Sequence, residues 1–537
     1  MKVGFLFGAG AEIAYGMPTG GRFALEIFRR NSDGAKQTFK DNRDRIEKTS
    51  NYASKWLPEK YHSKRVSTFR DSVFENIVKG TISNNRGKII SQINNFDDLA
   101  KATLNNNNVT EDDFVTMVES DFPEKNFDDI NFNQVLSYHQ NFSEGNALFA
   151  SKYFAILLFY YKEYSGFSKD DRDLLRDIIQ SIFQLHIGAM SEGLSRSLQE
   201  HIVEVDKTVD MDLFDNLGTN LQVNYQDAGV RGLELLSKSN GRDHQIIKLA
   251  FEILENIYSG VLDYKSVIDS NWHYLYIPMH EWGKFCNINI FLHSVREYIV
   301  DDCNLDSTRR GYYDDLSTQN GFEVSSVATT DYTNNLIEKK LLNVLGDGKI
   351  IFLNGCIGEY YNPYMNSIVS AEEFETTKQF LVPLIFTQSG TKPMTSVSML
   401  KRYVEYYNKL RESDFICSIG FGYNKDDEHI NGIIRTLIDE DDKKLVIIDI
   451  DNGQAVDGRR KDLATRLKVS KGYNIHYIIV GKERKIDDEL WTSYISQDNF
   501  LENLGIKNKI TQAHRNAQYH LPTPFWDPAF ILLKLSL

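Results

Sequence analysis

The sequence has few of the features that mark secreted, metal-binding and membrane proteins. Its 537 residues include only four cysteines and no C-x-x-C pair, which argues against a disulfide framework and a structural zinc site, so no zinc is expected. No apolar run approaches about 20 residues. Neither a transmembrane span nor a signal peptide is therefore expected, and the chain should be cytoplasmic.

An excess of positive charge is also missing. The chain carries 75 acidic and 61 basic residues, for a formal net charge of -14. This balance gives no global attraction to nucleic acid or to an anionic membrane, so direct binding to either is not expected. Any phosphate-bearing ligand must therefore be held by a local site.

The first thirty residues predict such a site. Val3 to Phe7 form an uncharged apolar run, typical of a strand buried on both faces, and a helix is expected after the turn Gly8-Ala9-Gly10-Ala11. Missing side chains let backbone N–H groups approach an anion, and a helix N-terminus adds partial positive charge. Because Ile13 stands where G-x-G-x-x-G has its third glycine, a tight turn without a ligand is the alternative.

The length predicts about three domains, or one domain with a large insertion. Residues 31–322 are dominated by amphipathic helical patterns and are expected to form an all-α insertion. Within it, Asn94 to Asn108 and Asp206 to Gly241 are expected to be loops. The helical patterns are Phe69 to Phe96, Val135 to Tyr164, Asp171 to Val203, His244 to Val267 and Trp282 to Val300.

From residue 323, short apolar runs alternate with helical patterns. Together with the opening strand they predict an α/β fold, a Rossmann-type doubly wound parallel sheet in a discontinuous domain. Its first segment is 1–30 and its second is 323–484, followed by a C-terminal extension at 485–537. The strands expected in the second segment are Val324 to Ala328, Lys349 to Leu353, Phe415 to Ile419, Leu445 to Ile450 and Ile475 to Val480.

Polar or glycine-rich turns follow four of the expected strands. Because open parallel sheets bind ligands at the carboxyl ends of their strands, these turns should converge on one site. They are Gly8 to Glu12, Thr329 to Asn335, Asn354 to Gly358 and Gly420 to Tyr423.

In this order, the four segments resemble the sirtuin superfamily, and more closely the sirtuin-like NAD-consuming domains of bacterial anti-phage defence proteins. GAGAEIAYGMPTG is similar to the family's GAG-x-S-x-x-x-G-x-P segment, with Glu12 in place of serine. TTDYTNNLIE and LNGCIGEYYNPYMNSIVSAEEF resemble two further segments. The last is DFICSIGFGYNKDDEHINGIIRTL followed by LVIIDID, and the resemblance covers about residues 1–30 and 323–451.

The resemblance implies that NAD is bound as substrate or ligand. Gly8, Ala9, Gly10, Ala11 and Glu12 would meet its pyrophosphate, and Pro18 and Thr19 would lie on a loop covering it. The adenosine half would contact Gly420, Phe421 and Gly422. Asp449 or Asp451 would accept from a ribose hydroxyl, a role suited to a carboxylate at a strand end.

At the two catalytic positions the chain departs from the family. Asp331 stands where the family has a catalytic Asn, and Asn354 where it has a catalytic His. Asn354 cannot accept a proton at neutral pH. Asp331 can stabilise an oxocarbenium-like transition state and orient water, as carboxylates do in glycoside cleavage, with Thr330 and Tyr332 beside it. Lysine deacetylation is therefore not expected.

Three functions stay open at this stage. The first is an NAD hydrolase that depletes NAD in anti-phage defence and is regulated by a partner or signal. The second is a catalytically degenerate module that senses NAD or an ADP-ribose derivative, and the third is a purely architectural subunit. The expected partners are further copies of the chain, a second defence protein acting as sensor, or both. The apolar tail His520 to Leu537 is expected to pack on the body or on another subunit.

Overall fold

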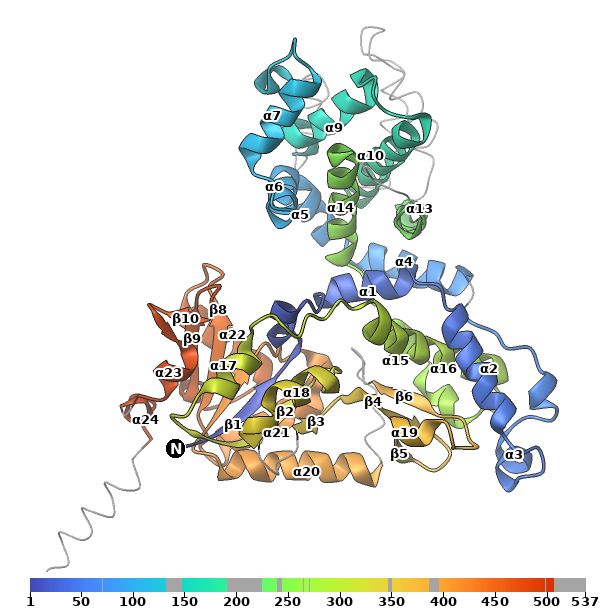
Figure 1. Cartoon of the computed structure of the whole chain (residues 1–537), viewed down its shortest axis with the longest axis vertical. Coiled ribbons are helices and arrows are strands. Elements are labelled where there is room, and N and C mark those ends of the chain that lie inside the picture. Colours follow the sequence, from blue (N-terminus) through green and yellow to red (C-terminus); the bar gives the residue numbers. More distant parts are fainter. Residues whose placement is uncertain are drawn as a thin grey trace, which may run out of the picture.

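The computed structural model describes residues 1–69, 71–131, 147–190, 225–238, 244–263, 265–269, 271–345, 350–385, 396–497 and 499–506. At its centre is a parallel sheet of six strands in the order β3-β2-β1-β7-β8-β9 (Figure 1). Its strands are β1 (Lys2–Phe7), β2 (Glu323–Thr329), β3 (Ile350–Phe352), β7 (Phe415–Ile419), β8 (Leu445–Ile450) and β9 (Ile475–Val480). The predicted α/β class and the parallel sheet are confirmed.

Alternating side chains of the strands enter two hydrophobic cores. Phe5 and Phe7 of β1 face one core, and Leu6 faces the other. Helices α17 (Tyr312–Thr318), α18 (Asn334–Leu345), α23 (Trp491–Ile495) and α24 (Phe500–Asn503) cover the first face. The second is covered by α20 (Val397–Glu412), α21 (Glu428–Asp439) and α22 (Val456–Leu467). A sheet buried on both faces explains the nearly continuous apolar strands.

In residues 31–322 the described elements are all helical. Figure 1 shows α5 to α14 gathered in a lobe away from the sheet. The helices of the lobe are α5 (Arg86–Asn94), α6 (Phe96–Asn106), α7 (Glu111–Asp121), α9 (Lys152–Glu163), α10 (Lys169–Met190), α13 (Tyr225–Ser237) and α14 (Gln245–Ser259). Besides α17, the other described α-helices of this range are α2 (Asp33–Arg45), α3 (Asn51–Trp56), α4 (Asp71–Asn84), α15 (Lys265–Asp269) and α16 (Trp282–Glu297).

Two stretches expected to be loops contain helices. Residues 96–106 of the Asn-rich stretch form α6, because Phe96, Ala100 and Leu104 recur at helical spacing and are buried. Likewise, α13 lies inside the expected loop 206–241 and buries Tyr225, Leu233 and Leu236. In both cases burial of one apolar face outweighs the low helix propensity of the polar residues. The rest of that second stretch that precedes α13 lies outside the described residues.

The expected helix directly after the glycine turn was wrong, since α1 (Gly20–Arg29) begins only at Gly20. Two short 3-10 turns, Ala9–Ala11 and Ile13–Tyr15, come first. Gly16 then adopts a left-handed φ of 101°, and Pro18 disfavours a helical conformation at the residue before it.

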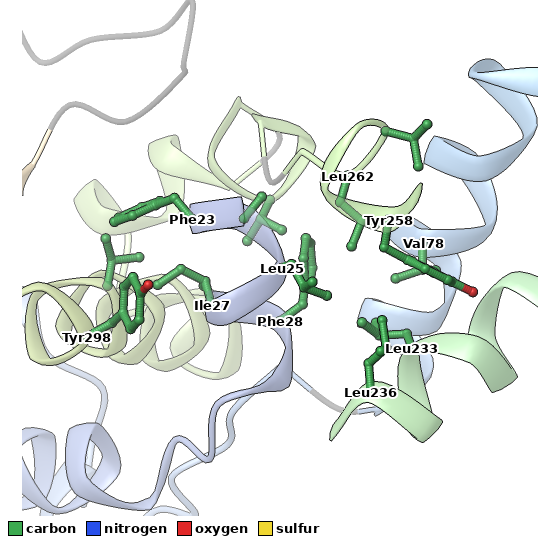
Figure 2. Packing of buried hydrophobic residues seen from close by; sticks show 14 of the residues in the cluster. Phe23, Leu25, Ile27, Phe28, Val78, Leu233, Leu236, Tyr258, Leu262 and Tyr298 are labelled. Atoms are coloured by element: carbon green, nitrogen blue, oxygen red, sulfur yellow. The ribbon is translucent and has the colours of Figure 1, made fainter. Parts of the chain in front are cut away.

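Helix α1 joins the sheet to the helical segment. In Figure 2, Phe23 and Ile27 point toward Tyr298, whereas Leu25 and Phe28 lie on the side of Val78, Leu233 and Tyr258. The side chains of Arg22 and Arg29 also donate to the buried carboxylate of Glu255 in α14, at 2.7 and 2.5 Å. The segment after the glycine turn is therefore fixed to the helical lobe.

Two small sheets complete the fold. Strands β4 (Gly355–Asn362), β5 (Ser367–Ser370) and β6 (Val382–Ile385) form an antiparallel sheet that was not expected, with α19 (Ala371–Phe374) beside it. The hairpin β10 (Lys485–Ile486) and β11 (Glu489–Leu490) leads to Trp491, whose ring lies 6.2 Å from that of Phe5. The described part of the expected C-terminal extension thus packs on the sheet through Trp491, Ile495, Phe500, Leu501 and Leu504. The expected packing of the tail His520 to Leu537 lies outside the described residues.

Candidate functional site

The central sheet reverses its strand order between β1 and β7. Numbered along the chain, its six strands lie in the order 3-2-1-4-5-6, so that the first and fourth strands are neighbours at the centre of the sheet. Ligands of open α/β sheets bind at this switch point, outside the carboxyl ends of the strands. The turns Gly8 to Glu12 and Gly420 to Tyr423 follow the two strands in question.

Backbone hydrogen bonds join these two turns. The N–H of Gly8 donates to the carbonyl of Ile419 at 2.9 Å, and that of Gly10 donates to Gly420 at 3.0 Å. A Cβ on Gly10 would lie 2.7 Å from the Cα of Gly420, and one on Gly8 would lie 2.6 Å from the Cα of Phe421. These glycines are thus required for the contact between the turns, whether or not a ligand binds there.

The other two turns join the same site from the β2 side. The N–H of Thr330 donates to the carbonyl of Phe7 at 3.0 Å, and the N–H of Leu353, just before Asn354, donates to Thr329 at 2.9 Å. Ile357 then donates to the carbonyl of Tyr332 at 2.9 Å. The four turns selected from the sequence therefore lie together at one edge of the sheet.

Few N–H groups of the glycine turn remain available for an anion. Those of Gly8, Gly10, Ala11 and Glu12 all donate to backbone carbonyls. Within the described part of the chain, the N–H groups of Ala9, Phe421 and Gly422 have no acceptor. Ala9 and Gly422 are exposed, and Phe421 is partly buried. An anion at the switch point would thus be bound by N–H groups from both turns.

Two buried carboxyl groups, those of Glu12 and Asp331, belong to these turns. Asp331 has 4% of its surface exposed and Glu12 has none. The hydroxyl of Tyr313, in α17, lies 3.1 Å from Oε1 of Glu12 and 3.3 Å from Oδ2 of Asp331. Thr333 also donates to Oε1 of Glu12, and Thr329 donates to Oδ2 of Asp331 at 3.3 Å. The carboxyl of Glu12 is therefore turned inward, away from the role at the pyrophosphate that the resemblance implied.

Burial dominates the titration of both acids. It raises the pKa of Asp331 to about 7, although hydrogen bonds from Tyr313 and Thr329 act in the opposite direction. Burial also raises the pKa of Glu12 well above its ordinary value, and the nearby Asp331 raises it further. Among the described residues no Lys, Arg or His forms an ion pair with either group. At neutral pH this site thus holds a carboxyl that changes charge.

The remaining predicted residues differ in their surroundings. Asn354 is buried beside the Leu353 carbonyl, which accepts from the hydroxyl of Tyr403 at 2.6 Å. Thr330, Tyr332 and Pro18 are partly buried, and Thr19 is exposed.

The two strand-end aspartates flank a buried arginine. Nη1 of Arg459 donates to Oδ2 of Asp449 at 2.7 Å, and Nη2 lies 3.5 Å from Oδ1 of Asp451. The Arg459 side chain is 3% exposed, whereas those of Asp449 and Asp451 are 44% and 71% exposed. Arg459 therefore compensates the charge of Asp449 and fixes its orientation, and free oxygen lone pairs remain toward solvent.

Sequence reasoning missed Tyr313, Thr333 and Arg459. Tyr313 is 301 positions from Glu12 and lies in the expected insertion, so no local pattern connects the two residues. Thr333 could have been found, since it belongs to the same polar turn as Asp331.

No group of three or more His, Cys, Asp or Glu residues in the described ranges is arranged to hold a metal ion. None of the helices in those ranges is both long enough and apolar enough to span a bilayer. Searches of protein-family models, of curated proteins and of solved structures found no match to this chain.

Proposed function

We propose that this chain is an NAD hydrolase that releases nicotinamide and ADP-ribose, and that it acts as an NAD-depleting effector in bacterial anti-phage defence. The observation that carries the proposal is the position of Asp331. Its carboxyl lies next to the switch point of the sheet, where two turns present free N–H groups suited to a pyrophosphate. The resemblance of the same four turns to sirtuin-like NAD-consuming domains supports NAD as the ligand.

In the proposed reaction, the bond between the nicotinamide nitrogen and C1′ of the ribose breaks, and its electron pair leaves with nicotinamide. Water forms the new bond to C1′. Ionised Asp331 would stabilise the positive charge that develops on the ribose and accept the proton that the water loses. Asn354 would orient polar groups of the substrate but cannot replace a basic histidine.

Regulation and assembly belong to the same proposal. We expect a cytoplasmic protein whose helical segment responds to a partner or a signal, acting as a homo-oligomer, with a second defence protein, or both. Direct contact between α1 and the helical lobe supports such a connection, because α1 is the first helix after the turn Gly8 to Glu12.

The test is nicotinamide release by the purified full chain, alone and with the product of its genomic neighbour. Asp331→Asn and Asp331→Ala should each lower turnover by at least about 100-fold, in the range typical of a positioned acid or base. Asp457→Asn is the control, since that carboxylate is exposed and its one ion pair within the described ranges is with Arg460. If every assembled form binds NAD without releasing nicotinamide, the hydrolase proposal fails.

One observation favours a second candidate function, a sensor of NAD or an ADP-ribose derivative. Asp331 is only 4% exposed and is held by two hydroxyl groups, and the usual basic histidine is replaced by Asn354. For a sensor, calorimetry should show ligand binding and ligand-dependent assembly that survive in Asp331→Ala. For a hydrolase, the same variant should bind NAD without turning it over.

A further inference from the structure

Hydrogen-bond counting requires a proton between the two buried carboxyls. The hydroxyl of Tyr313 lies within hydrogen-bonding distance of both Glu12 and Asp331, yet it has only one proton to donate. If both acids were ionised, one of these contacts would place a hydroxyl lone pair against a carboxylate. Two buried negative charges that no Lys, Arg or His of the described ranges contacts would in addition cost several kcal/mol.

A second observation is the other oxygen of Glu12. Its Oε2 is buried and has no hydrogen-bond partner among the residues that the structure describes. An ionised carboxylate in this position would leave one charged oxygen without any donor, which is among the most costly arrangements in a protein interior. Burial of the neutral acid costs much less free energy at this position.

We propose that Glu12 and Asp331 act as one proton-sharing carboxyl pair, in which Glu12 keeps its proton and Asp331 is the member that ionises. Tyr313 is the positioning residue that fixes the two groups. This assigns Glu12 a role other than pyrophosphate binding. Its consequence for catalysis rests on the proposed hydrolase activity, but the pair itself does not.

Exposure decides which member ionises. Asp331 retains 4% of its surface, whereas Glu12 has none. Contact with water lowers the free energy of a charge, so the negative charge settles on Asp331. A neutral Glu12 then leaves a single negative charge to face the positive charge that develops on the substrate.

The neighbouring titratable groups do not supply an alternative. Tyr15, whose ring stacks on that of Tyr313 at 5.4 Å, and Tyr313 itself both have pKa values raised far above neutrality by burial. Burial raises the pKa of Cys303 to about 11. Burial acts to raise the pKa of Asp314, but the pair with Lys340 and hydrogen bonds from Gly311 and Tyr15 outweigh it and lower the pKa. From the β7 side the turn presents Gly420, Phe421 and Gly422, and from the β2 side Thr329 and Thr333.

The experiment counts protons without using NAD. Hydrogen exchange of β1 and β2 in the full chain measures the constant for opening of the sheet as a function of pH, with intrinsic exchange rates subtracted. Between about pH 5.5 and about pH 6.5, both acids should be protonated in the folded state and ionised when the sheet opens. For each pH unit, the opening constant of wild type should therefore increase by a factor about 100 times larger than that of the Glu12→Gln, Asp331→Asn double variant.

In each single variant one proton fewer should be released on opening, so the increase of the opening constant per pH unit should be about 10-fold smaller than in wild type. If wild type and the double variant have the same slope, the pair does not exist. Should the double variant not fold, the two single variants decide, since a single variant with the slope of wild type contradicts the proposal. If opening of the sheet releases two protons but the chain releases no nicotinamide, the carboxyl pair is supported and the hydrolase proposal is rejected.

Activity gives the second readout. Asp331→Asn should lower nicotinamide release by at least about 100-fold, and Glu12→Gln, which keeps a neutral group but removes the O–H donor of the acid, should lower it less than Asp331→Asn. Asp457→Asn, at an exposed carboxylate paired with Arg460, is the control that should leave release unchanged. Tyr313→Phe removes a hydrogen bond that lowers the pKa of Asp331, so its pH–rate profile should move to higher pH with little change in KM. Equal losses in Glu12→Gln and Asp331→Asn, with a raised KM in the former, would show that charged Glu12 binds the substrate.

Discussion

Gly10 and Gly420 hold the two central strand ends together. The N–H of Gly10 donates to the carbonyl of Gly420 at 3.0 Å, and the Cα of Gly420 lies 2.7 Å from where a Cβ on Gly10 would be. This contact places one turn from each side of the switch point against the other. The anion-binding surface that we infer from the N–H groups of Ala9, Phe421 and Gly422 depends on this contact.

The first prediction concerns Gly420→Ala. Gly420 has φ of +69°, and a Cβ there would lie 2.3 Å from the N of Ala11. The variant should lower the free energy of unfolding by about 2–4 kcal/mol and weaken NAD binding. Gly432→Ala is the matched control, because no atom lies within 4 Å of its added Cβ and it sits inside α21. It should raise the free energy of unfolding by about 0.5–1 kcal/mol, and calorimetry with urea unfolding checks both.

The second prediction is a pH dependence with opposite signs for activity and stability. Because burial raises the pKa of Asp331 to about 7, nicotinamide release should rise about tenfold per pH unit below neutrality and level off above it. The folded-state pKa exceeds the unfolded value, so the stability contribution is complete below about pH 4 and is lost as pH rises through about 7. Release that is independent of pH between about pH 5 and about pH 8 would contradict the assignment of Asp331 as base.

The third prediction concerns Arg459→Gln. Loss of the buried guanidinium removes the partner of Asp449 and a donor to the Ile450 carbonyl at 2.9 Å. We expect a loss of about 1–3 kcal/mol in unfolding free energy and weaker binding of ADP-ribose, because Asp449 loses its fixed orientation. Arg460→Gln, on the same helix and 40% exposed, should change either quantity little. If the two variants behave alike, Arg459 does not organise this end of β8.

The fourth prediction concerns Trp491. Its ring packs on Phe5, and its Nε1 donates at 2.9 Å to Asp315, which also binds Arg484. Trp491→Ala should cost about 3–5 kcal/mol, because a fully buried indole is removed. Trp491→Phe keeps most of the packing and should cost less, about 1–3 kcal/mol for the lost donor. Urea unfolding of the full chain measures both, and an unaffected Trp491→Ala would show that Trp491 is not part of the sheet's core.

The sequence was sufficient for the strands of the central sheet and for three of the four turns, whereas most of the expected turn Asn354 to Gly358 is the start of strand β4. Phe415–Ile419, Leu445–Ile450 and Ile475–Val480 were predicted with their observed bounds, because strands buried on both faces are nearly continuous apolar runs. The convergence of the four turns followed from the rule for parallel sheets. Polar helices such as α6 were missed, since their burial depends on neighbours that a local pattern does not contain.

What the sequence alone determined is thus the parallel sheet and the set of turns at its carboxyl edge, including Glu12 and Asp331 as members of that set. Only the tertiary structure decided that Glu12 turns inward, that it meets Asp331 through Tyr313, and that Arg459 holds Asp449. The physical reason is that residues adjacent in the sequence determine a strand, whereas the protonation of a buried carboxyl depends on groups that are distant in the sequence and surround it in the fold.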